Sequence, residues 1–174
     1  MRTIESRGKI KDIKDAKNVA KNIGCEFKGY YSARDMIFKS KKVERGIIDL
    51  RAFSMNNRQS KNYILTQKIA EWSGKTKKDK IVLKDSFDTM GEALAFMIVH
   101  YGEDLKEDYR YSREGWEYGL EKGDIFIEVI EKLGPTIEIE ADNKSDLEDL
   151  FKLFEVTERF SESTPEIMRK LLRK

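Results

Sequence analysis

Charged residues alternate with apolar or small residues in several short segments, in patterns that could bind a metal ion or an anionic ligand. Glu138 and Glu140 alternate with isoleucines near the end of the chain. Glu5, Arg7 and Lys9 share one side of a similar segment near its start. Carboxylate oxygens are ligands for hard divalent cations, and Arg and Lys neutralise phosphate oxygens. Together these residue types could bind a metal-bound polyphosphate.

The same alternation has two structural interpretations. In an antiparallel sheet it arises when one face packs on a core and the other face meets solvent. Alternatively, the charged faces could line the lumen of a barrel, where charges are costly unless they are paired, hydrated or compensated by a ligand. Composition and alternation leave both interpretations open.

The segments that must position these residues read as about eight strands and four helices. Period-two alternation and extended-chain signals predict strands at 4–10, 30–39, 47–53, 63–71, 80–87, 107–120, 124–132 and 136–141. Helical spacing and capping signals predict helices at 12–23, from Thr89 to Tyr101, from Ser145 to Phe154 and from Thr164. The polar stretch 72–79 is expected to be a turn or exposed loop.

The order of these segments predicts the fold class. Strands mostly follow one another directly, so antiparallel pairing is expected. Eight antiparallel strands can close into a barrel. The prediction is therefore an α+β fold, an eight-stranded antiparallel β-barrel with helices packed outside.

Composition narrows the class of protein. A chain of 174 residues is expected to form a single domain, residues 1–174. Its 34 Lys and Arg nearly balance its 32 Asp and Glu, which argues against general nucleic-acid binding.

One cysteine and one histidine exclude a disulfide framework, a Cys-rich zinc site and His-pair metal motifs. The apolar runs are short and the N-terminus has no signal-peptide pattern, so a cytoplasmic protein without a membrane partner is expected; its oligomeric state stays open.

One segment resembles a known family. Leu133–Glu140, LGPTIEIE, is similar to the Leu-Gly, two-residue, apolar-Glu-apolar-Glu strand of the CYTH family, also called triphosphate tunnel metalloenzymes. The likeness spans about residues 4 to 156. Its other motifs are the Arg-bearing Ser112–Glu117, the acid-bearing Ile125–Val129, Leu65–Lys68, Leu50–Arg51 and Arg34–Phe38.

The resemblance implies a closed eight-stranded tunnel that binds a triphosphate with Mg²⁺ or Mn²⁺. Activities in the family include tripolyphosphatase, thiamine triphosphatase, RNA triphosphatase and class IV adenylyl cyclase. Tripolyphosphate, a nucleoside triphosphate and thiamine triphosphate are therefore the implied ligands. The residues implied are Glu5, Glu138 and Glu140 for the metal, Arg7, Lys9, Arg51, Lys68, Lys84 and Arg113 for the phosphates, and Glu128 as a catalytic residue that holds a ligand or activates water.

The sequence departs from the family pattern at three positions. The first strand of the family reads Glu-x-Glu-x-Lys, but Arg7 stands here at the second Glu. Phe53 replaces the second Arg of Leu-Arg-x-Arg, and Tyr111 replaces a Lys before Arg113. One metal ligand has thus become a cation, and two phosphate-binding cations are missing. We therefore expect one metal ion rather than two, with Arg7 supplying part of the second positive charge.

The leading hypothesis from the sequence is metal-dependent hydrolysis of an inorganic or organic triphosphate. One alternative is cyclisation of ATP, as in a class IV adenylyl cyclase. Another is a protein that binds a polyphosphate or nucleotide without turning it over, which the change at Arg7 motivates.

Overall fold

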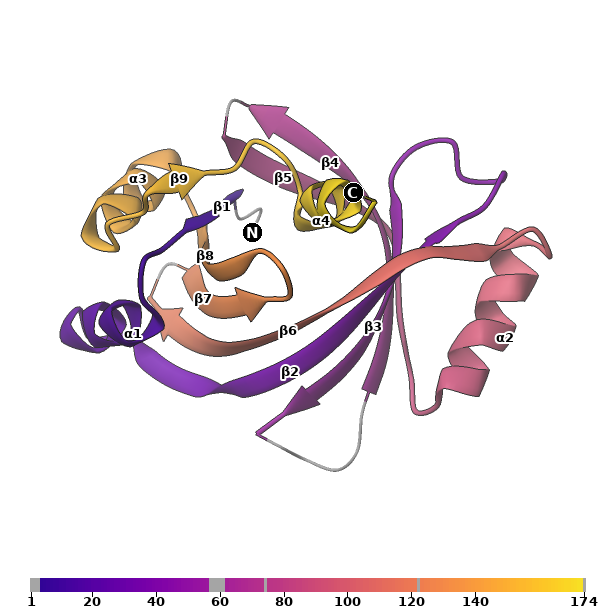
Figure 1. The fold of residues 1–174 in the computed structure, drawn as a ribbon, viewed down its shortest axis with the longest axis horizontal. Helices are drawn as coiled ribbons and strands as arrows, with labels where there is room; N and C mark the ends of the chain where they lie inside the picture. Colours follow the sequence, from indigo (N-terminus) through magenta and orange to yellow (C-terminus); the bar gives the residue numbers. More distant parts are fainter. Residues whose placement is uncertain (1–3, 57–61, 74, 122, 174) are drawn as a thin grey trace.

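The computed structural model describes residues 4–56, 62–73, 75–121 and 123–173, and within them one antiparallel sheet dominates (Figure 1). Its strand order is β5-β4-β3-β2-β6-β7-β8-β1-β9. The strands are β1 (Ile4–Lys9), β2 (Glu26–Lys39), β3 (Ile47–Met55), β4 (Asn62–Ser73), β5 (Thr76–Phe87), β6 (Lys106–Leu120), β7 (Gly123–Ile130), β8 (Gly134–Ala141) and β9 (Glu158–Arg159).

The sheet curls until its first and fifth strands meet, so the predicted α+β tunnel is confirmed. The contact between β1 and β5 is one register pair, Glu5 with Lys77. The same edge of β1 also pairs with the two-residue strand β9, at Gly8 and Lys9. Because β9 occupies this part of the edge, the tunnel is not a regular closed barrel of eight strands.

Lys75 lies in a turn, but the predicted turn or exposed loop at 72–79 is too long. Strands β4 and β5 continue through most of it, and their last register pair is Ser73 with Thr76. Backbone pairing in a tight hairpin does not depend on apolar side chains, so a polar stretch can still be a strand.

The helices of the described residues are α1 (Ile13–Asn22), α2 (Met90–Tyr101), α3 (Lys144–Leu153) and α4 (Thr164–Leu172), and local capping signals mark where they begin. Thr89 and Glu92 form the predicted capping box of α2. The predicted start of α3 at Ser145 is wrong, because Asn143 is its N-cap and accepts from the backbone N–H of Asp146 at 3.0 Å. None of the described helices is both long and apolar enough to cross a membrane.

Helices cover the outer face of the sheet, which decides between the two interpretations of the alternation. Helices α1 and α3 pack over β7, β8 and β1, where Ile137 and Ile139 are buried beneath them. Helix α2 packs over β3 and β4, where Leu50 and Leu65 are fully buried. In Figure 1 these two groups of helices lie at opposite ends of the long axis. The strand faces beneath these helices thus point outward, and the faces that carry most of the predicted site residues point into the lumen.

Helix α4 covers part of the lumen itself. Its Met168 is buried with Tyr109, Tyr111 and Ile130. Its first residues, with Pro165 among them, line the cavity inside the tunnel. Helix α4 therefore shapes the lumen, whereas the other three helices pack against the outer wall.

Candidate functional site

The lumen contains a cavity of about 540 Å³ that gathers nearly all the predicted site residues. Its lining includes Glu5, Arg7, Arg51, Lys68, Lys84, Arg113, Glu128, Glu138 and Glu140. Lys9 is absent from this lining. It lies at the end of β1, and its Nζ is 3.2 Å from a carboxylate oxygen of Glu158. Strand β9 thus provides an acidic partner for Lys9 outside the cavity.

Three carboxylates meet at one side of the cavity. Glu5, Glu138 and Glu140 each offer an oxygen, and these oxygens all lie within 4.8 Å of one another. The register explains the cluster, because Glu140 lies opposite Glu5 across β8 and β1. Burial, together with the charges of Glu138 and Glu5, raises the pKa of Glu140 to about 7. Carboxylates this close repel one another unless a cation lies between them, so the donor set fits a hard divalent ion.

Arg7 supplies positive charge beside this acidic cluster. Its guanidinium, which is 7% exposed, donates to both Glu128 and Glu138. It also donates to the Thr136 hydroxyl at 3.2 Å. Arg7 therefore pairs with two carboxylates and one hydroxyl, and Glu138 links it to the acidic cluster.

A chain of buried ion pairs continues from Arg7 across the lumen wall. Glu128, which is 1% exposed, also accepts from Arg113 at 2.9 Å and from the Tyr31 hydroxyl. Burial alone would raise the pKa of Glu128, but Arg7 and Arg113 outweigh it and hold that pKa below its usual range. Glu128 is thus ionised, and three donors occupy its oxygens.

Asp35 extends the ion-pair chain to the next strand. Its fully buried carboxylate lies 2.9 Å from Arg113 Nε and accepts from Arg51 Nε at 2.6 Å. We call Arg7, Glu128, Arg113, Asp35 and Arg51 the lumen network. Sequence analysis did not propose Asp35 or Tyr31 as site residues, although Asp35 lies within a segment that carries the family resemblance.

Gly115 makes room for this arrangement. A Cβ at this position would lie 2.9 Å from Glu128 Cγ, from Tyr31 Cζ and from the carbonyl oxygen of Ile127. Contacts this short would displace either the backbone or both side chains. The glycine two residues after Arg113 therefore lets Tyr31 reach Glu128.

Asp49 is a buried carboxylate of the cavity whose charge is poorly compensated. Its Oδ1 has no hydrogen-bond partner among the residues that the structure describes, and its Oδ2 lies 3.6 Å from Arg51 Nη2. Burial and the charge of Asp35 raise the pKa of Asp49 to about 7, against the opposing effect of Arg51. Sequence analysis also missed Asp49, which shares a strand face with Arg51.

The raised pKa of Asp49 predicts how stability depends on pH. Unfolded Asp49 loses its proton near pH 4 and folded Asp49 near pH 7, so stability decreases as the pH rises between them. Asp49→Asn removes this loss. Since one pKa unit is worth about 1.4 kcal/mol, and about two of the three units lie above pH 5, we expect the stability of the variant relative to wild type to rise by on the order of 3 kcal/mol from pH 5 to pH 8. Urea unfolding at both pH values measures this. The exposed Asp142→Asn is the control, and an equal gain at both pH values would contradict the assignment.

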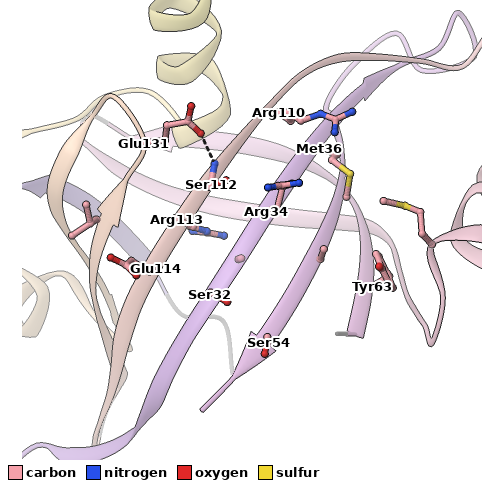
Figure 2. A pocket seen from close by; sticks show the side chains of 14 residues that line it. Ser32, Arg34, Met36, Ser54, Tyr63, Arg110, Ser112, Arg113, Glu114 and Glu131 are labelled. Atoms are coloured by element: carbon pink, nitrogen blue, oxygen red, sulfur yellow. Dashed lines mark hydrogen bonds between the residues drawn. The ribbon is translucent and has the colours of Figure 1, made fainter. Parts of the chain in front are cut away.

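A second cavity of about 480 Å³ lies on the outer wall, over β2, β3 and β6. Met36 and Tyr63, which line it, belong to the apolar cluster beneath α2. Figure 2 shows Arg34 and Ser112 on neighbouring strands, and the Ser112 backbone N–H donating to Glu131 at 3.0 Å. Of the predicted site residues, only Arg113 contributes to this lining. The predicted chemistry therefore gathers in the lumen, and Arg34 and Glu131 serve as matched controls on the outer wall.

Comparison with known proteins identifies the fold. Neither a scan against protein-family models nor a search of curated proteins finds a match. Solved structures do match along nearly the whole chain. The PH1819 protein from Pyrococcus horikoshii has a TM-score of 0.77 at 16% identity, with 99% of both chains covered.

Two further structures carry descriptions of activity. HpAC1 from Hippeastrum, described as an adenylyl cyclase candidate with a dominant triphosphatase activity, has a TM-score of 0.69 at 12% identity, covering 97% of this chain and 95% of its own. An adenylate cyclase candidate from Vibrio parahaemolyticus has a TM-score of 0.70 at 14% identity, covering 97% and 98%. The chain therefore has the tunnel fold that its resemblance to the CYTH family implies.

Proposed function

We propose that the lumen binds a triphosphate together with one divalent cation, Mg²⁺ or Mn²⁺, and hydrolyses the terminal phosphoanhydride bond. The observation that carries this proposal is the meeting of three carboxylates within 4.8 Å in the same cavity as Arg51, Lys68 and Lys84. The acidic groups of the lumen suit the cation of a metal-bound triphosphate, and the basic groups suit its phosphates. The fold neighbours described as cyclase candidates, one with triphosphatase activity, support the same reading.

The residues of the lumen divide into two roles under this proposal. Lys68, Lys84 and Arg51 neutralise phosphate oxygens and stabilise the charge that develops on the transferred group. Arg113 is held by Asp35 and Glu128, so it fixes the shape of the wall. The resemblance implies two roles for Glu128, to hold a ligand or to activate water. Because three side chains already donate to its carboxylate, we favour a role in holding these side chains.

Hydrolysis in this cavity needs no dedicated base. The acidic cluster would hold the cation, which supplies charge neutralisation and lowers the pKa of an attacking water. In the overall reaction the water oxygen forms a bond to the terminal phosphorus and the bridging P–O bond breaks. Phosphate and the diphosphate product leave, and the proton lost by the water passes to solvent. A separate proposal concerns domain organisation. The described helices all pack on one sheet, which supports a single domain over residues 1–174.

A second candidate function is binding without turnover. It is favoured by Arg7, which already compensates Glu138 and leaves less negative charge for a metal. Cyclisation of ATP is distinguished by its products, since it yields diphosphate and a cyclic nucleotide instead of phosphate. Product analysis separates these outcomes.

Phosphate release tests the proposal. We expect release from a triphosphate with Mg²⁺ or Mn²⁺ and its loss in EDTA. Glu140→Gln removes one of the clustered carboxylates, and we expect at least a tenfold loss of activity or metal affinity, because even residues that only support metal ligands typically contribute that much. Glu131→Gln, on the outer wall, should behave as wild type. Binding of a triphosphate without release by the wild-type protein would favour the non-catalytic function instead.

A further inference from the structure

The lumen has an apolar wall as well as a charged one. Phe53 on β3 packs against Tyr31 on β2, with ring centroids 5.6 Å apart and planes at 34°. Both rings line the cavity, as do Ile64, Ile81 and Phe126. Ile81 is 56% exposed although it contributes to this lining, so its apolar surface is open to a ligand.

The apolar wall lies directly beside the cations. Phe53 is two residues after Arg51 on the same strand, so the two side chains share a face and start about 7 Å apart. A triphosphate neutralised by Arg51 would therefore carry whatever is attached to it within reach of Phe53. An inorganic tripolyphosphate has no apolar surface to place there.

Tyr31 makes this wall rigid. Its ring is 5% exposed, and its hydroxyl donates to Glu128 of the lumen network. Phe53 thus rests on a ring that a buried hydrogen bond holds in place. A preorganised aromatic surface binds a flat ring with little loss of conformational freedom.

We infer that Phe53 is a specificity-determining residue that selects triphosphates bearing a planar ring over inorganic tripolyphosphate. This inference rests on the proposed function of the lumen. Phe53 offers a π-face and no hydrogen bond, so it recognises an aromatic heterocycle of the kind found in nucleoside triphosphates without distinguishing one base from another. A ring at this position favours an organic ligand, whereas a cation would favour an all-phosphate ligand.

Calorimetric titration with ATP, CTP and tripolyphosphate at constant Mg²⁺ tests the inference. We expect wild type to bind both nucleotides more tightly than tripolyphosphate. Phe53→Leu should weaken nucleotide binding about tenfold, as removal of a stacking side chain does, and leave tripolyphosphate binding unchanged. Phe53→Arg should reverse the preference by tightening tripolyphosphate binding. Phe27→Leu is the matched control, because Phe27 packs on Tyr118 and does not line the cavity.

The outcomes separate this inference from the proposed function. Equal loss of nucleotide and tripolyphosphate affinity in a folded Phe53→Leu protein, or equal affinities in wild type, would overturn the role of Phe53 and leave the triphosphate site standing. Absence of binding by all three ligands would overturn both. Thermal unfolding of each variant checks that it is folded, and the conservative Phe53→Leu keeps the test decisive if Phe53→Arg does not fold.

Discussion

Replacing Arg113 with methionine is expected to lower the free energy of unfolding by about 3–5 kcal/mol, the usual loss when one partner of a buried ion pair is removed. Arg113 lies 2.9 Å from both Asp35 and Glu128, and all three side chains are buried. The methionine fills similar space but leaves each carboxylate with one arginine in place of two. Urea unfolding at neutral pH measures the loss.

Arg110→Met is the control for this prediction. Arg110 lies on the same strand and donates twice to Glu107, but its side chain is 56% exposed. Exposed pairs of this kind contribute about 0–1 kcal/mol. If Arg113→Met is no more destabilising than Arg110→Met, the lumen network does not hold the tunnel together.

Reversing the charge of Arg7 is expected to make the fold depend on metal. Arg7→Glu would place a carboxylate between Glu128 and Glu138, both of which Arg7 now compensates. Without metal the repulsion should destabilise the protein by several kcal/mol, because the remaining buried charges lose their partner. A divalent ion would restore the balance, and binding at about a hundred times its dissociation constant adds roughly 2.7 kcal/mol.

Thermal unfolding with and without Mn²⁺, together with Mn²⁺ calorimetry, measures this effect. We expect the variant to bind Mn²⁺ at least tenfold more tightly than wild type and to regain stability as Mn²⁺ is added. Lys9→Glu makes the same charge change on the same strand outside the cavity lining, and it should do neither. Unchanged Mn²⁺ affinity in a folded Arg7→Glu protein would mean that Arg7 does not face a metal position.

The acidic cluster could be predicted from sequence because strand alternation is a local property. Glu138 and Glu140 share a face whatever the register of their neighbours, and the resemblance indicated that this face is internal. The same reasoning placed Lys9 beside Arg7. Lys9 instead pairs with Glu158 of strand β9 at the end of β1, and its role toward phosphates stays a prediction.

The lumen network could not be predicted in the same way. Asp35 meets Arg113 and Arg51 across strand boundaries, and such partners depend on register and on the tilt of the strands. Asp49 was missed because its unusual feature is a carboxylate oxygen without a hydrogen-bond partner among the described residues, which only a packed structure reveals. Gly115 carried a faint signal, since a glycine inside a strand often marks a close approach of other groups.

Binding of triphosphates in the charged lumen is measured by calorimetric titration of an arginine pair. Arg51 and Arg34 lie on neighbouring strands but line different cavities, the lumen and the outer wall. A hydrogen bond to a charged group is worth about 1.5–3 kcal/mol. With ATP or tripolyphosphate in Mg²⁺, we expect Arg51→Gln to bind at least tenfold more weakly than wild type and Arg34→Gln to bind as tightly as wild type. Equal losses in the two variants, or no binding by the wild-type protein, would contradict binding in the lumen.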